Sequence, residues 1–163
     1  MKIELIILAS AIFSIGLMTG VFFTSSNAVK PGIGKLGDLE YLTALQSMNR
    51  VILNIPFKVV FVFSIISVAL VPVFYIDLFP KKIFWLYIFT FIIYWVGVFG
   101  VTVFANIPLN EKLDKTNLES ISTKQIEELR TSIELKWNNF NLIRAVCSAI
   151  IFLLLIISLI LNI

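Results

Sequence analysis

Four long apolar stretches constrain this chain more than any other feature of its sequence. They cover about residues 3–23, 57–76, 83–104 and 140–161. At about 1.5 Å of rise per residue, a helix over each stretch is long enough to cross a hydrocarbon core about 30 Å thick. The chain is 14% charged, whereas soluble domains carry about 25% charged residues. The sequence therefore predicts an all-α, four-transmembrane-helix bundle that forms a single domain, residues 1–163, in a lipid bilayer.

The first apolar stretch is interpreted as a retained span rather than a cleaved signal peptide. Lys2 is a weak basic leader, and Ser26-Asn27-Ala28 loosely resembles a small-residue cleavage site. The stretch is nevertheless about twenty residues long, and the apolar region of a signal peptide usually covers about 7–15 residues. We therefore expect it to form the first helix of the bundle.

Polar segments predict an extramembrane helical cap over about residues 30–55 and 106–138. Three glycines and a proline in residues 30–37 predict a loop. A helix is expected to begin near Asp38, whose side chain suits a helix N-cap. Pro56 should break or kink this helix before the second span.

The fourth helix is expected to be long and to project beyond the membrane. Ser122 and Gln125 have the spacing of a capping box, which favours a helix start at that point. No residue after Ser122 interrupts a helix, and about forty residues would extend about 60 Å. An apolar stripe on its first part should pack on the segment at 38–55; the stripe consists of Ile126, Leu129, Ile133 and Trp137.

Polar side chains gather at one end of the expected bundle. Because the chain crosses four times, the end of the first span and the start of the second share a side with the end of the third and the start of the fourth. The other side holds only the termini and a short turn near Pro80. The polar and aromatic residues at the converging ends are Asn49, Arg50, Asn106, Pro108, Asn110, Trp137, Asn141 and Arg144. A functional site is expected there.

Arg144 is the one charged residue well inside an apolar span. Trp137, Asn141 and Arg144 have the spacing i, i+4 and i+7, so they share one helix face. An arginine at such a depth costs a few kcal/mol unless it has a partner or a water-filled cavity. Arg144 either extends to the interface and bonds helix-terminal carbonyls, or is a fixed positive charge in a pocket. Its candidate partners are Glu134, Glu111, Asp114, the amides of Asn49, Asn106 and Asn110, backbone carbonyls and an external anion.

The third span is expected to end near Phe104. Pro108 should force Ile107 toward an extended conformation. Asn106 can close the helix in a left-handed conformation, and Asn110 can cap the helix that follows. Several amides around one arginine can also form a polar network, which is either a structural lock or a ligand cradle.

Composition argues against several classes of function. The chain has no histidine, which removes the commonest metal ligand and the usual near-neutral base; we expect no metal site. Cys147 is the only cysteine and is interpreted as a small apolar residue of the fourth span. A net charge of +3 with interleaved acids does not indicate a nucleic-acid partner. A transporter or channel has little support from a single intramembrane charge, unless the chain oligomerises.

Basic residues give the expected orientation. Lys2, Lys81 and Lys82 favour cytoplasmic termini, because short cytoplasmic segments are enriched in lysine and arginine. Against this, ten of the thirteen basic residues lie on the opposite side. The expected location is a bacterial cytoplasmic (inner) membrane.

Two motifs near the C-terminus are similar to those of a known family. Thr102-x3-Asn106-x-Pro108-x-Asn110, followed by Trp137-x3-Asn141-x2-Arg144, resembles the signature of the anthrone-oxygenase-like integral membrane proteins. Lys30-Pro31-Gly32 with Asn49-Arg50 resembles the first-loop pattern of the same family. Most members have no known function, and some fungal members oxidise anthrones to anthraquinones with molecular oxygen and no evident cofactor. The resemblance implies a four-span bundle and a cofactor-independent monooxygenase.

The same resemblance supplies the candidate site residues. The candidate catalytic residues are Arg144, Asn141 and Asn106, and the candidate ligand-binding residues are Asn49, Arg50, Asn110 and Trp137. Arg144 would stabilise an enolate, the amides would hold its oxygens, and Trp137 would stack on an aromatic ring. No base is obvious, since only Glu134 or Glu111 remains. The alternative is a noncatalytic membrane module that binds a lipophilic ligand or a partner protein, as a monomer or a homo-oligomer.

Overall fold

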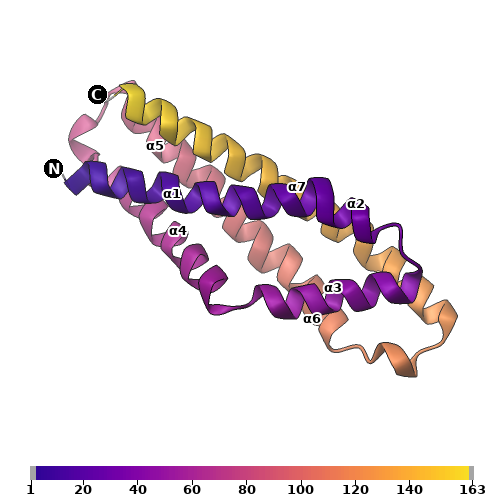
Figure 1. Cartoon of the computed structure of the whole chain (residues 1–163). Coiled ribbons are helices and arrows are strands. Elements are labelled where there is room, and N and C mark those ends of the chain that lie inside the picture. The colour runs from indigo at the N-terminus through magenta and orange to yellow at the C-terminus, as the bar shows by residue number, and fades with distance from the viewer. Residues whose placement is uncertain (1–2, 162–163) are drawn as a thin grey trace.

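The computed structural model describes residues 3–161, and this part of the chain is all-helical (Figure 1). Four of its helical stretches are long and apolar enough to cross a membrane, and the ends of the described chain lie at one end of the bundle. The four stretches are Ile3–Ile33, Ile55–Phe74, Lys82–Asp114 and Thr123–Leu161. The predicted all-α bundle with four apolar spans is confirmed, and the chain is an integral membrane protein.

The first long helix is longer than predicted. Helix α1 (Ile3–Thr24) continues through a π-helical turn, η1 (Ser25–Val29), into α2 (Lys30–Ile33). The prediction of a loop over 30–37 is therefore wrong for its first four residues. Pro31 lies in the first turn of α2, where the missing N–H of proline is tolerated.

The break before the second span lies where the sequence predicts it. Helix α3 (Asp38–Ile52) begins at Asp38, although Gly37 is the cap residue, and α4 (Ile55–Phe74) follows after two residues. The Asn54 side chain accepts a hydrogen bond of 2.9 Å from the Phe57 N–H, which caps the start of α4. Pro56 lies in the first turn of α4. Proline is tolerated there because the N–H it lacks would have no partner within the helix.

The third long helix does not end near Phe104, as predicted, but continues to Asp114. After a short 3₁₀ turn, η2 (Ile76–Leu78), the helix α5 (Lys82–Ile93) runs through two π-helical segments, η3 (Tyr94–Gly100) and η4 (Thr102–Asn106), into α6 (Ile107–Asp114).

The π-helical segments explain why proline does not end this helix. Ile107 has right-handed helical angles (φ −58°, ψ −49°), and no residue in the described range has a left-handed backbone. A π-helical turn contains an extra residue, and η4 places Pro108 in the first turn of α6, where no N–H is needed.

The fourth long helix, α7 (Thr123–Leu161), follows a 3₁₀ turn, η5 (Leu118–Ser120), and is uninterrupted over 39 residues. Its capping box is confirmed, because the Ser122 N–H donates to Gln125 Oε1 at 2.9 Å and the Gln125 N–H donates to Ser122 Oγ at 3.4 Å.

Two apolar clusters hold the bundle together. The larger lies among the spans and includes Leu8, Ile15, Met18, Val98 and Leu155. The second, which we call the cap cluster, joins α3, α6 and the first part of α7; its buried members are Tyr41, Leu42, Leu45, Leu113, Leu118, Ile126, Ile133 and Trp137. The predicted packing of the α7 stripe on α3 is therefore present.

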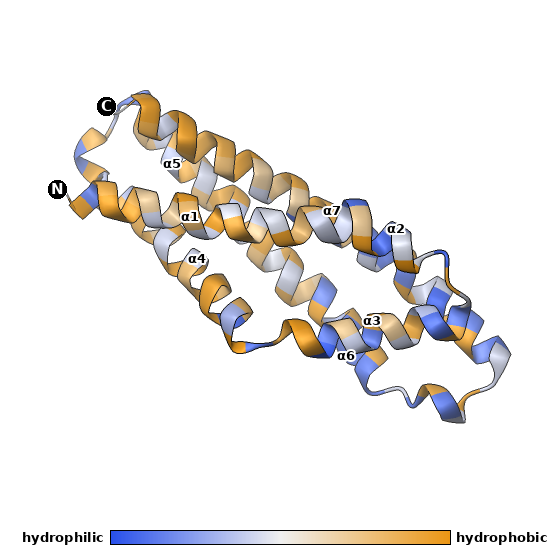
Figure 2. Ribbon diagram, in the orientation of Figure 1, coloured by the Kyte–Doolittle hydropathy of each residue, from blue (hydrophilic) through white to orange (hydrophobic). Residues whose placement is uncertain are grey.

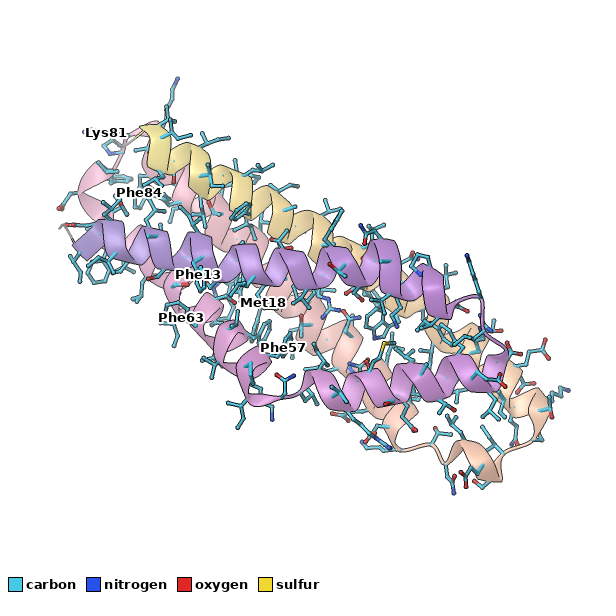
Figure 3. The ribbon with its side chains drawn as sticks, in the orientation of Figure 1. Phe13, Met18, Phe57, Phe63, Lys81 and Phe84 are labelled. Atoms are coloured by element: carbon cyan, nitrogen blue, oxygen red, sulfur yellow. The ribbon has the colours of Figure 1, made fainter. Side chains whose placement is uncertain are left out.

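Large apolar side chains also cover the outside of the spans. Phe13 on α1 and Phe63 on α4 are exposed (Figure 3). Exposed phenylalanines would be unfavourable in water but are favourable against lipid acyl chains. The outer surface of the bundle is thus suited to contact with a bilayer.

Candidate functional site

A cavity of about 920 Å³ lies between the two apolar clusters. Its walls come from α1, η1, α2, α3, the start of α4, η4, α6 and the middle of α7. Its volume is in the range of small-molecule binding sites. Six of the seven predicted site residues line it: Asn49, Asn106, Asn110, Trp137, Asn141 and Arg144.

The Arg144 side chain is inside the bundle and is only 7% exposed. Its Nη2 donates to Asn141 Oδ1 at 2.7 Å, and its Nη1 donates to Thr102 Oγ1 at 3.4 Å. The guanidinium carbon lies 4.5 Å from the centre of the Phe22 ring, while Nε has no hydrogen-bond partner. Arg144 therefore contacts cavity residues and does not extend to the outside of the bundle.

The acidic residues considered as partners of Arg144 are engaged elsewhere. The three ion pairs are Glu134 with Arg130, Glu111 with Lys115, and Asp114 with Arg50. Within residues 3–161, Arg144 has no ion pair with a carboxylate. A buried cation without an anion is unfavourable in an apolar environment, so the site favours a negatively charged or oxygen-bearing ligand.

Asn141 joins α7 to the end of α1. Its Nδ2 donates to the Phe22 carbonyl at 3.1 Å and to Ser26 Oγ at 2.7 Å, while its Oδ1 accepts from Arg144. Both N–H groups of the amide and one lone pair of its oxygen are thereby engaged. Asn141 positions Arg144, and both side chains are buried.

Two further amides contribute unpaired polar atoms to the cavity. Both side-chain polar atoms of Asn106 are buried without a partner, and Asn106 is 1% exposed. The Nδ2 of Asn49 is likewise buried without a partner. Each unpaired buried polar group costs about 1–3 kcal/mol. Groups of this kind on a cavity wall are available to bond a ligand.

Lys30 also faces the cavity, although the sequence analysis did not place it in the site. Its side chain is 5% exposed, and its Nζ lies 3.6 Å from the centre of the Trp137 ring without a hydrogen-bond partner. The signal was the spacing of Lys30 four residues after Ser26 and eight after Phe22, which is one helix face. Pro31 and the nearby glycines concealed it, because they indicate a loop.

Trp137 is held in place from two sides. Its Nε1 donates to Asn110 Oδ1 at 2.7 Å, and the Lys30 ammonium lies over one face of its ring in a cation–π contact. The predicted stacking of Trp137 on a ligand is therefore not possible on that face. Asn110 acts by orienting the indole.

Arg50 is the one predicted site residue that the structure does not bring to the cavity. Its side chain is 60% exposed and pairs with Asp114 on α6. It is not among the cavity-lining residues. We therefore do not carry Arg50 into the site.

The remaining ionisable and metal-binding side chains near the cavity add little to its chemistry. In the cap cluster, burial and secondarily the negative charge of Glu134 raise the pKa of the Tyr41 phenol above its ordinary value, so Tyr41 stays protonated. No group of three or more His, Cys, Asp or Glu side chains in the described part of the chain could hold a metal ion. Arg144 and Lys30 are the cavity's buried basic side chains, and its amides are its neutral donors.

Comparison with known protein families gives one match. Residues 50–154, more than half of the chain, match the family described as anthrone oxygenase. This range contains Asn106, Asn110, Trp137, Asn141 and Arg144, and begins one residue after Asn49. No curated protein and no solved structure matches the chain.

Proposed function

The chain belongs to the anthrone oxygenase family, and we propose that its cavity binds a lipophilic aromatic compound that then reacts directly with molecular oxygen. The observation that carries this proposal is the buried Arg144 guanidinium, which faces the cavity with no ionic partner among residues 3–161. A cation fixed in apolar surroundings stabilises a developing oxyanion more than the same cation in water does.

The proposed reaction needs little from the protein beyond this charge. An anthrone is a carbon acid, and its enolate passes an electron to oxygen without a cofactor. The methylene carbon loses two hydrogens and gains one oxygen atom, and the second oxygen atom leaves as water. Arg144 would stabilise the enolate oxygen, and the unpaired amide of Asn106 would donate a second hydrogen bond. No cofactor takes part in this proposal.

A second candidate function is a noncatalytic module that holds a lipophilic ligand. The observation that favours it is the lack of a carboxylate base: among the described residues, no Asp or Glu lines the cavity. Glu134 and Glu111, the bases considered from sequence, are paired with Arg130 and Lys115. The open volume supports a ligand more than a partner protein, because the converging helix ends are not filled by side chains.

The proposal includes a membrane location. We place the chain in a bacterial cytoplasmic membrane with cytoplasmic termini, as the positions of Lys2, Lys81 and Lys82 favour. Helix α3, helix α6 and the first part of α7 would then form an extramembrane cap on the opposite side. The cavity would lie at the boundary between this cap and the membrane.

Substitution of Arg144 tests the proposal. In purified protein in lipid nanodiscs, Arg144→Leu should weaken anthrone binding at least tenfold and reduce oxygen uptake to the spontaneous rate. Its melting temperature should stay within a few degrees, because leucine suits the apolar surroundings. Arg50→Leu is the matched control, since it removes an arginine outside the cavity. It should leave anthrone binding, oxygen uptake and the melting temperature unchanged.

Two results would argue against the catalytic proposal. Unchanged anthrone binding in Arg144→Leu, together with a sharp loss of thermal stability, would make Arg144 a structural lock. Tight binding to the wild-type protein without oxygen uptake above the spontaneous rate would favour the noncatalytic module.

A further inference from the structure

One side of the cavity is open, and the rim of this opening is largely apolar. Residues of α1 form one edge, and residues from the end of α3 to the middle of α4 form the other. Eleven residues on these edges are both exposed and cavity-lining. Seven are apolar or glycine: Leu17, Gly20, Val21, Val51, Ile52, Leu53 and Val62. The other four are polar: Thr24, Ser47, Asn54 and Lys58. Figure 3 shows Phe57, a further lining residue, near the start of α4.

The opening extends along the spans rather than across their ends. Its α1 edge reaches from Leu17 to Thr24, which is about 10 Å of helix. Leu17 and Gly20 belong to one of the helices apolar enough to cross a membrane, and Val62 belongs to another. At the depth of these three residues an apolar rim contacts lipid acyl chains, because water is scarce there.

The lining has an apolar part and a polar part. Phe57 and Phe61 line the part near α4. The buried polar residues of the lining are Lys30, Asn106, Asn141 and Arg144. The Lys30 ammonium has no hydrogen-bond partner. A ligand that matches both regions has an apolar body and an anionic or hydrogen-bond-accepting oxygen end.

We propose that the cavity is loaded sideways from the bilayer, through a portal between α1 and the α3–α4 junction. The ligand is a membrane-dissolved amphiphile whose oxygen end reaches Lys30 and Arg144. This inference rests on the proposed function, since it concerns the same cavity. It adds Lys30 to the residues that bind the ligand. It also places Gly20 at the entrance of the portal, where a larger side chain would block entry.

Gly20 allows the portal to be blocked without disturbing the packing. A Cβ atom added at Gly20 meets no atom within 4 Å, so a larger side chain there would extend into the opening. Gly32 is equally free of neighbours within 4 Å but does not line the cavity. Gly32→Phe is therefore the matched control for Gly20→Phe. A second control, Ser47→Phe, adds the same bulk to the exposed polar part of the rim on α3.

The first test measures uptake of anthrone from phosphatidylcholine vesicles. The full chain carries Trp85→Phe and Trp95→Phe, so that the fluorescence of Trp137 alone reports on the cavity. Gly20→Phe should slow the quenching by anthrone at least tenfold, whereas Gly32→Phe and Ser47→Phe should change it less than twofold. Melting temperatures measured in parallel show whether each variant is folded.

The second test needs no ligand in the cavity. In vesicles of phosphatidylcholine with brominated acyl chains, an open portal brings bromine near Trp137. Gly20→Phe should reduce this quenching by at least half relative to Gly32→Phe. This measurement reports on the portal even if anthrone does not bind.

The outcomes separate the portal from the proposed function. If Gly20→Phe and Gly32→Phe behave alike in both tests, or if Ser47→Phe is the slow variant, the portal is wrong. The proposed function would then still stand, provided that Arg144→Leu abolishes anthrone binding. A bromine effect specific to Gly20→Phe, together with no anthrone binding to any protein, supports the portal and rejects anthrone as the ligand type.

Discussion

At the scale of single residues, Asn141 is the side chain on which the geometry of the site depends. It bonds the Phe22 carbonyl, the Ser26 hydroxyl and the Arg144 guanidinium at the same time. Because Arg144 has no ionic partner in the described range, this amide is its strongest hydrogen-bond partner. Asn141 therefore affects both stability and binding.

Asn141→Leu should lower the free energy of unfolding by about 2 kcal/mol. Leucine has a similar size, so the loss comes from the polar groups of Phe22, Ser26 and Arg144 that are left unpaired. The measurement is thermal unfolding in detergent. Asn139→Leu, at an exposed position of the same helix, is the control; an equal effect of the two substitutions would contradict the role of Asn141.

At this scale the sequence predicted part of the cavity lining. Trp137, Asn141 and Arg144 share a face because helical periodicity alone decides it. Lys30 was missed despite its helical spacing after Phe22 and Ser26, since Pro31 and the glycines that follow indicate a loop and the π-helical turn before them has no sequence signal. Arg50 was placed in the site through the Asn49-Arg50 pattern. Its pairing with Asp114 was not predictable, because the continuation of the third helix to Asp114 was not foreseen.

At the scale of the elements, α7 and the third long helix approach closely at Gly97. A Cβ atom added at Gly97 would lie 3.0 Å from Cys147 Cβ and still closer to Cys147 Sγ. Glycine is required there because the two helices leave no room for a side chain. This contact fixes the π-helical segment η3 against α7, below the cavity wall that contains Thr102 and Asn106.

Gly97→Ala should destabilise the protein by about 1–3 kcal/mol, because the added methyl group overpacks the contact with Cys147. Adding Cys147→Ala should restore part of the loss by removing Sγ. Gly20→Ala, at a position with open space, should be neutral. Thermal unfolding of the three variants measures these effects, and a neutral Gly97→Ala would show that the helices are farther apart.

Helix boundaries differed in how far the sequence predicted them. The break between α3 and α4 was predictable, since Pro56 and the capping side chain of Asn54 act locally. The course of the third helix beyond Phe104 was not. Apolar periodicity does not reveal the extra residue of a π-helical turn, and this turn is what accommodates Pro108 in the helix.

At the scale of the whole molecule, the cavity lies where the span cluster and the cap cluster meet. Four crossings with short connections bring alternate helix ends together, so the sequence was sufficient to predict the convergence of polar residues. It was not sufficient to predict an open volume, because the volume depends on how far α3 and α4 separate from α1. The apolar spans and the more polar cap are distinct in Figure 2.

The most direct test of the account is an experimentally determined structure of the protein in lipid nanodiscs with anthrone. We expect the ring system inside the cavity, with its oxygen about 3 Å from a nitrogen of the Arg144 guanidinium, and Asn49 and Asn106 on the surrounding wall. A structure in which the Arg144 head group extends into the lipids, or in which side chains fill the space between α1, α4 and α7, would contradict the central claim.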